Sequence, residues 1–148
     1  MVTIRIKSAE EMIELGKKIG NNLFPNFIII LNGDLGAGKT TFTKGIGKAL
    51  KIKEIINSPT FTILKTYDGI LPLYHMDCYR IENESDDFLL EEYFSIDGVT
   101  VVEWGDQIKS LLPKERLDIF IKIISNHERE VVINGTTKSY QKIEELFR

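Results

Sequence analysis

The chain has 148 residues, of which 43% are hydrophobic and 28% charged, typical of one globular domain and unlike a disordered, collagen-like or rod-shaped protein. Nineteen basic and 22 acidic residues give a net charge of −3, which argues against tight nucleic-acid binding by this chain alone. The single Cys78 cannot form an internal disulfide, and the longest apolar run, Phe27–Leu31, is far shorter than the ~20 residues of a membrane span. Because residues 1–7 lack the apolar core of a signal peptide, we expect a soluble cytoplasmic protein without a membrane segment.

The first part of the chain has strand and helix patterns in alternation. Residues 1–7 alternate apolar and polar side chains, which predicts a short strand. The capping-box spacing of Ser8 and Glu11 predicts that a helix follows directly. The uniformly apolar segment Phe27–Leu31 predicts a strand covered on both faces, and a Gly-rich loop separates it from a helix predicted over about 39–50.

The rest of the chain is predicted to supply most of the sheet. Asp68-Gly69 suits the tight turn of a β-hairpin, so we expect strands over 61–67 and 70–77. The further predicted elements are a helix over 81–94, a strand at Val99–Glu103, a short helix around 107–111, strands at 117–124 and 130–133, and a closing helix over 139–147. Without a repeat or linker, this order favours one α/β domain over residues 1–148 with a mixed sheet flanked by helices.

The strongest motif is G-D-L-G-A-G-K-T, which fits the phosphate-binding pattern G-x-x-x-x-G-K-[ST]. Its backbone N–H groups and the start of the following helix would surround a polyphosphate, which requires loop conformations that glycine adopts readily. Lys39 would contact the terminal phosphates of a nucleotide, and the Thr40 hydroxyl would bind Mg²⁺. The residues of this predicted site are Gly33, Asp34, Leu35, Gly36, Ala37, Gly38, Lys39 and Thr40.

Two carboxylates at the ends of predicted strands are candidates for the rest of a phosphoryl-transfer site. Glu103 ends an apolar strand in the manner of a Walker B segment, and Asp77 ends another strand. Either acid could hold Mg²⁺ or orient the attacking water, and a solvated acid is the structural alternative for both. Thr60 follows Ser58 and Pro59 in a loop, where it could act as a switch residue or serve only in the turn.

Several other polar residues have a structural explanation at least as good as a functional one. His75 lies within a predicted strand and Cys78 is an isolated thiol, so we predict neither a zinc site nor a reactive cysteine. Trp104 could be a core aromatic or a stacking residue. Two groups of like charges are expected to be solvated faces, and together they could be docking surfaces. They are a lysine cluster of Lys44, Lys48, Lys51 and Lys53 and an acidic stretch of Glu82, Glu84, Asp86, Asp87, Glu91 and Glu92.

Four motifs taken together resemble the TsaE family, also called YjeE. They are NGDLGAGKTT at 32–41, SPTF at 58–61, YHMDCYR at 74–80 and VEW at 102–104, in this order over nearly the whole chain. The resemblance implies a P-loop NTPase fold and slow hydrolysis of ATP with Mg²⁺. This activity would support N6-threonylcarbamoyladenosine synthesis at position 37 of tRNAs reading ANN codons. It also implies that the ATPase cycle resets a complex of the partners TsaB and TsaD, that TsaC makes the activated intermediate, and that tRNA is bound through the partners.

The same resemblance implies roles for individual residues. Those on the phosphate side are Lys39 and Thr40 for phosphate and Mg²⁺, Thr41 for a further phosphate contact, Glu103 as the metal-side carboxylate, Asp77 as the second acid and Thr60 as the switch threonine. The adenine would lie between Ala9 and the turn at Glu128 and Arg129. The chain departs from the family at 87–92, which lacks the usual Leu-Gly step before Tyr93, away from the ATP site.

Rival readings of the phosphate-binding motif are a small kinase, a GTPase and an assembly module that binds ATP without hydrolysing it. A kinase usually needs clustered arginines, whereas the five arginines of this chain are dispersed. The guanine-reading pattern Asn-Lys-x-Asp is absent from the sequence, which argues against a GTPase. The assembly module stays open, because a slow ATPase carries the same motifs.

Overall fold

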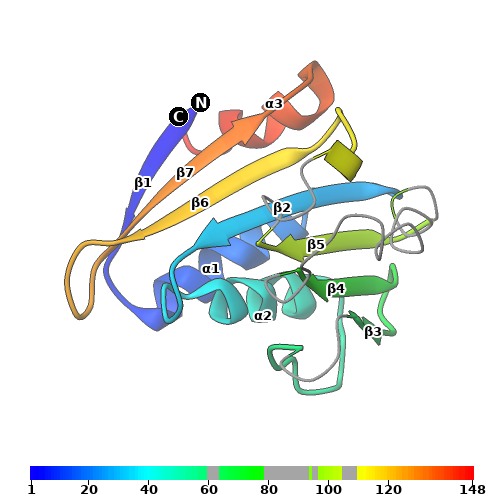
Figure 1. The fold of residues 1–148 in the computed structure, drawn as a ribbon, viewed down its shortest axis with the longest axis horizontal. Helices are drawn as coiled ribbons and strands as arrows, with labels where there is room; N and C mark the ends of the chain where they lie inside the picture. The colour runs from blue at the N-terminus through cyan, green and yellow to red at the C-terminus, as the bar shows by residue number, and fades with distance from the viewer. Residues whose placement is uncertain (60–63, 79–93, 95–96, 105–109) are drawn as a thin grey trace.

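The computed structural model describes residues 1–59, 64–78, 94, 97–104 and 110–148. Within these residues the chain forms a seven-stranded mixed sheet in the order β1-β7-β6-β2-β5-β4-β3 (Figure 1). The strands are β1 (Val2–Ile6), β2 (Phe27–Gly33), β3 (Leu64–Tyr67), β4 (Leu73–Asp77), β5 (Val99–Glu103), β6 (Leu117–Ile123) and β7 (Arg129–Gly135), and the helices are α1 (Ala9–Gly20), α2 (Lys39–Ala49) and α3 (Lys138–Glu145). None of the described helices is long and apolar enough to cross a membrane.

The central strand β2 has the burial that its sequence predicts. Phe27, Ile29 and Leu31 pack in the larger core, while Ile28 and Ile30 pack in a second core on the opposite face. β2 pairs in parallel with β5 and β6, and β5 pairs in parallel with β4. The carboxyl ends of these four strands therefore lie at the same edge of the sheet, where ligands bind in open α/β sheets.

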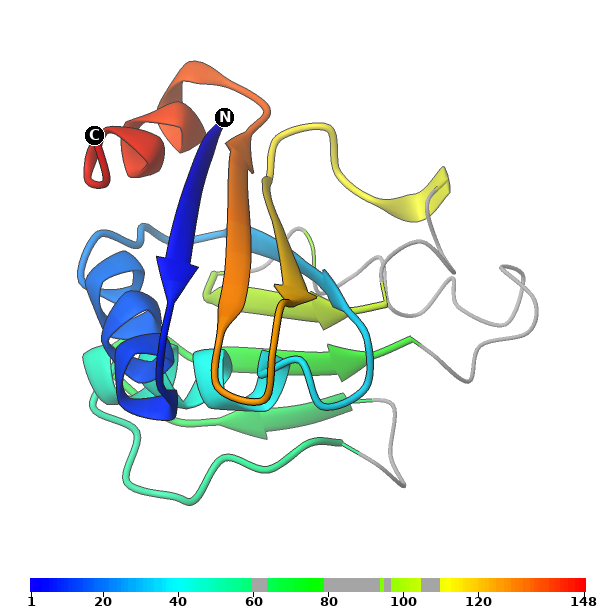
Figure 2. The same cartoon turned by 90° about the vertical axis from the view of Figure 1, so that its left-hand side faces the viewer.

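Helices α1 and α2 pack side by side against the face of the sheet that holds the larger core (Figure 2). As predicted, α1 begins after Ser8, whose Oγ accepts a hydrogen bond from the Glu11 N–H at 3.1 Å. The Glu11 carboxylate accepts in turn from the Lys7 N–H at 3.0 Å. The two helices approach closely, because a Cβ added at Gly45 of α2 would lie only 2.2 Å from the Ile13 carbonyl oxygen of α1.

The predicted tight turn at Asp68-Gly69 is wrong. β3 and β4 do form an antiparallel hairpin, but Tyr67 pairs with Leu73, so the connection is residues 68–72 and not a two-residue turn. Gly69 has no positive φ and serves a close approach instead, since an added Cβ would lie 2.5 Å from the Leu50 carbonyl oxygen. The Ile70 N–H donates to that same oxygen at 2.7 Å, so the loop is held against the end of α2.

The other predicted elements are confirmed wherever the structure describes them. β1, β5, β6, β7 and all three helices agree with the predicted ranges to within a few residues. The predicted helix over 81–94 lies outside the described residues except for Phe94, and the predicted short helix at 107–111 lies mostly outside them.

Candidate functional site

The Gly-rich loop lies between the carboxyl end of β2 and the first residue of α2, as the motif requires. Gly36 has φ +81° and Gly38 has φ +113°, backbone conformations that residues with a Cβ rarely adopt. Gly38 is the N-cap of α2, so the partial positive charge of the helix start is directed at the loop. A Cβ added at Gly36 would have no heavy atom within 4 Å, which leaves this part of the loop open to a ligand.

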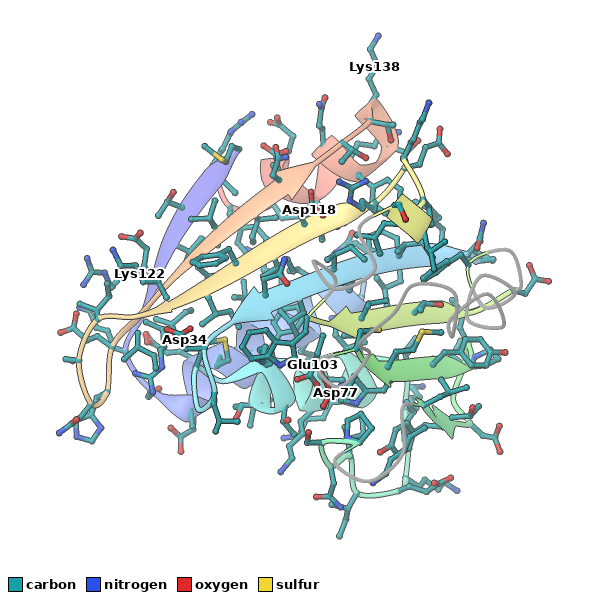
Figure 3. All side chains as sticks on the ribbon, in the orientation of Figure 1. Asp34, Asp77, Glu103, Asp118, Lys122 and Lys138 are labelled. Atoms are coloured by element: carbon teal, nitrogen blue, oxygen red, sulfur yellow. The ribbon has the colours of Figure 1, made fainter. Side chains whose placement is uncertain are left out.

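A cavity of about 580 Å³ lies against this loop, within the size range of ligand sites. It brings together predicted phosphate-side residues from three separate elements. Figure 3 shows Asp77 and Glu103 next to each other, to the right of the loop that carries Asp34. The lining residues are Leu35, Gly36, Gly38, Lys39, Thr40, Thr41, Ser58, Asp77, Glu103 and Trp104. Thr60 lies outside the described residues, but Ser58 of the same loop lines the cavity.

Lys39 is only 6% exposed and lies inside this cavity. Its Nζ donates to the Gly33 carbonyl oxygen at 2.5 Å and lies 3.7 Å from the centre of the Trp104 ring. Burial lowers the pKa of Lys39, and the negative charges of the nearby acids oppose this shift, with Glu103 the strongest of them. Trp104 directly follows β5 and has φ +60°.

The two predicted acids are neighbours across the parallel pair of β4 and β5, where Asp77 is in register with Glu103. Glu103 is only 3% exposed, and its Oε2 contacts Nε2 of His75, a completely buried side chain of β4. Nδ1 of His75 is buried and has no hydrogen-bond partner in the described structure. The contact between His75 and Glu103 was not predicted, although the i, i+2 spacing of His75 and Asp77 places both on one face of a strand.

The side chains of the cavity fit a magnesium–nucleotide complex. Mg²⁺ is usually held by one or two carboxylates or hydroxyls together with substrate phosphates and water, and not by a cage of protein ligands alone. The described residues contain no group of three or more His, Cys, Asp or Glu side chains that could hold a metal by themselves. Thr40 with one of Asp77 and Glu103 would therefore supply the protein ligands, and the lysine and backbone N–H groups would surround the phosphates.

A second cavity of about 220 Å³ adjoins the first one, with which it shares Gly36, Gly38 and Thr41. Ala9 and Arg129, two of the three residues expected on the adenine side, line it. The third, Glu128, does not line it, and its hairpin neighbours Asn126 and His127 do. The remaining lining residues are Ser8, Met12 and Ala37.

The buried strand, the Gly-rich loop with its Lys-Thr pair, the helix that follows and the carboxylates on neighbouring strands define a P-loop NTPase fold. A sequence profile described as threonylcarbamoyl adenosine biosynthesis protein TsaE matches residues 6–131 of this chain. The chain therefore belongs to the TsaE family, as its motifs predict.

Individual relatives agree with this assignment. The chain is 49% identical over 146 residues to the tRNA threonylcarbamoyladenosine biosynthesis protein TsaE of Bacillus subtilis. The alignment covers 97% of this chain and 92% of that protein. It is 39% identical over 135 residues to the TsaE protein of Treponema pallidum, which covers 86% of this chain and 96% of the other. The crystal structure of Bacillus subtilis YdiB superposes with a TM-score of 0.86 at 42% identity, over 98% of this chain and 92% of that one.

Proposed function

We propose that this chain binds ATP with Mg²⁺ in the 580 Å³ cavity and hydrolyses it slowly, as part of N6-threonylcarbamoyladenosine biosynthesis on tRNA. The pathway is proposed from the names of its relatives, and the chemistry from the cavity. The single observation that carries the chemistry is that Lys39, Thr40, Asp77 and Glu103, from three elements, line one cavity. We place the protein in the cytoplasm, where tRNA is modified.

Each side chain has a definite task in this proposal. Lys39 exchanges its contacts with the Gly33 carbonyl and the Trp104 ring for the terminal phosphates, whose charge it offsets. Thr40 and Glu103 hold the cation, which when bound neutralises charge on the transferred phosphoryl group. Asp77, next to Glu103 in the register, orients the attacking water. Exchanging the tasks of the two acids gives the alternative version of the same site.

The ATPase cycle is proposed to reset a partner complex of TsaB and TsaD, with tRNA bound through those partners. The net charge of −3 supports this division, because direct tRNA binding needs a basic surface. The proposed role of the chain is therefore a nucleotide-driven conformational step, and the transfer of the threonylcarbamoyl group belongs to the partners.

The experiment that tests this proposal is the rate of ATP hydrolysis by the purified chain, alone and with TsaB and TsaD of the same organism. Stimulation by the pair supports an ATPase that works on that complex. ATP binding with no hydrolysis in either condition would contradict the ATPase and leave an assembly module. Transfer of phosphate to an added acceptor would instead indicate a kinase.

Three alanine variants test the roles of the side chains. Lys39→Ala should abolish tight Mg-ATP binding, because no other described lysine lines the cavity. Glu103→Ala and Asp77→Ala should retain most ATP binding but lose hydrolysis, since the acids act on the cation and water and not on the nucleotide itself. Unchanged ATP affinity in Lys39→Ala would refute the phosphate site, and unchanged turnover in Asp77→Ala would return that residue to a structural role.

A further inference from the structure

Arg129 is the first residue of β7, 92 positions after Ala37. Its guanidinium group nevertheless lies directly against the Gly-rich loop of residues 33–40, the phosphate loop. Its Nε donates to the Ala37 carbonyl oxygen at 2.9 Å, and its Nη2 lies 3.3 Å from the Gly36 carbonyl oxygen. The side chain is half-buried. These contacts join the loop at one end of α2 to a hairpin from the other half of the sheet.

The same guanidinium group also organises the tip of the β6–β7 hairpin. Its Nη1 donates to the Ser125 carbonyl oxygen at 2.7 Å and to the Glu128 carbonyl oxygen at 2.9 Å. The tip is closed further by the Glu128 N–H, which donates to Ser125 Oγ at 3.2 Å. One planar group therefore contacts four carbonyl oxygens, two in the hairpin and two in the phosphate loop, which a lysine ammonium cannot do in the same geometry.

The contact with Ala37 has a consequence for the neighbouring backbone donor. Because a trans peptide group is planar, the carbonyl of Ala37 and the N–H of Gly38 point in opposite directions. When Arg129 holds the Ala37 oxygen on one side of the loop, the Gly38 N–H is turned to the other side, at the start of α2. Donors at this position are the ones with which a helix N-terminus binds an anion.

We propose that Arg129 is a positioning residue: by binding the carbonyl oxygens of Gly36 and Ala37, it holds the phosphate loop in the conformation that binds phosphate. The affinity for phosphate then depends on the β6–β7 hairpin that carries Arg129. This inference rests on the proposed binding of ATP at the loop and adds to it a residue that acts through the loop backbone. It differs from a contact with the base, which would affect only ligands that carry adenine. The two roles therefore separate when the polyphosphate is tested without its nucleoside.

The test compares Mg-ATP with Mg-tripolyphosphate by titration calorimetry on wild type, Arg129→Lys and Arg5→Lys. Arg5 is a matched control, because it donates to Glu128 Oε2 of the same hairpin at 2.9 Å but has no bond to the phosphate loop among the described contacts. We expect Arg129→Lys to weaken both ligands by about tenfold, the effect of one or two lost hydrogen bonds, and Arg5→Lys to weaken neither.

The possible results divide clearly. Loss of ATP affinity with unchanged tripolyphosphate affinity would overturn the inference and leave Arg129 as a base contact. Equal losses in Arg129→Lys and Arg5→Lys would also overturn it, since any damage to the hairpin would then suffice. A wild-type chain that binds neither ligand would refute the proposed function itself, and the inference with it.

A measurement on the wild-type chain keeps the inference testable if Arg129→Lys fails to fold. The Nε proton of Arg129 should exchange with water more slowly than that of Arg5 in NMR spectra, because it donates to Ala37. Addition of Mg-tripolyphosphate should slow its exchange further, as the loop becomes ordered around the anion. Exchange as fast as that of Arg5 in both states would overturn the inference.

Discussion

Nε2 of His75 contacts Oε2 of Glu103 across the β4–β5 pair, and both side chains are buried. Because a carboxylate only accepts, Nε2 of His75 is the donor in this contact. The contact engages one oxygen of Glu103 and limits the rotation of its carboxylate. The orientation of the acid expected to hold the cation is thus set by a histidine that itself does not line the cavity.

Replacing either member of this pair should have different consequences. His75→Ala leaves a buried carboxylate without its donor, so we expect the free energy of unfolding to fall by about 1–3 kcal/mol and ATP hydrolysis to slow about tenfold. Glu103→Gln keeps an oxygen that can accept from His75, so the fold should lose less than about 1 kcal/mol while hydrolysis is lost. Urea unfolding and a phosphate-release assay check both variants, and wild-type turnover in His75→Ala would show that Glu103 needs no such support.

The contact between Lys39 and Trp104 gives an optical signal for nucleotide binding. Trp104 is the only tryptophan of the chain, and the Lys39 ammonium lies 3.7 Å from its ring centre. Mg-ATP should draw this ammonium toward the phosphates and change the tryptophan emission in a saturable way. Lys39→Ala should give no saturable change in emission. A wild-type change in that variant would show that the emission does not report on the position of Lys39.

Two glycines of α2 provide a matched test of helix packing. A Cβ at Gly45 would lie 2.2 Å from a backbone oxygen of α1, whereas a Cβ at Gly47 would meet the flexible end of Ile56, also at 2.2 Å. Gly45→Ala should lower the free energy of unfolding by about 1–3 kcal/mol, because backbone cannot move aside cheaply. Gly47→Ala should be nearly neutral, since a gain in helix propensity of about 1 kcal/mol offsets the repacking. Thermal unfolding measures both, and equal losses would contradict the packing described for α1 and α2.

Glu144 should make the stability of the fold depend on acid pH. It is 2% exposed, accepts from the Gly135 N–H at 2.8 Å, and lies against the amine of Met1 and Nη2 of Arg148. Burial alone would raise the pKa of Glu144, but its hydrogen bonds and the two positive charges together bring the pKa below its ordinary value of 4.5.

A carboxyl whose pKa is lowered in the folded state adds stability above its ordinary pKa, and this stability is lost as the pH falls through the folded pKa. Glu144→Gln should therefore be less stable than wild type by about 1–3 kcal/mol at pH 7. The difference should shrink progressively below about pH 4.5. Urea unfolding at several pH values measures it, and a difference that does not vary with pH would contradict the charged contacts.

The strands, helices and phosphate loop were predictable because their signals are local. Phe27–Leu31 is apolar throughout, and Ser8 with Glu11 marks a helix start, so no distant residue is needed to interpret them. The turn at Asp68-Gly69 was mispredicted for the opposite reason. Gly69 is required by the Leu50 carbonyl of a different element, and the same dipeptide in isolation favours a tight turn.

The candidate site was also predictable only where its signals are local in the sequence. Lys39 and Thr40 follow from one contiguous motif, while the proximity of Asp77 and Glu103 depends on the register of two strands that the sequence does not specify. His75 becomes significant only through that register. The contact of Arg129 with Gly36 and Ala37 spans more than 90 positions and has no local pattern at all.

The sheet order also bears on how the chain matures during synthesis. β1 pairs with β7, from Val2 opposite Ile133 to Ile6 opposite Arg129, so β1 cannot pair until β7 has also been synthesised. Pairing over such a sequence distance is slow to form compared with local contacts. The hydrogen bond of Ala37 in the phosphate loop to Arg129 can form only after the ribosome has added the 92 residues that follow Ala37. Nascent chains of this protein therefore carry the nucleotide motif long before they carry a finished nucleotide site.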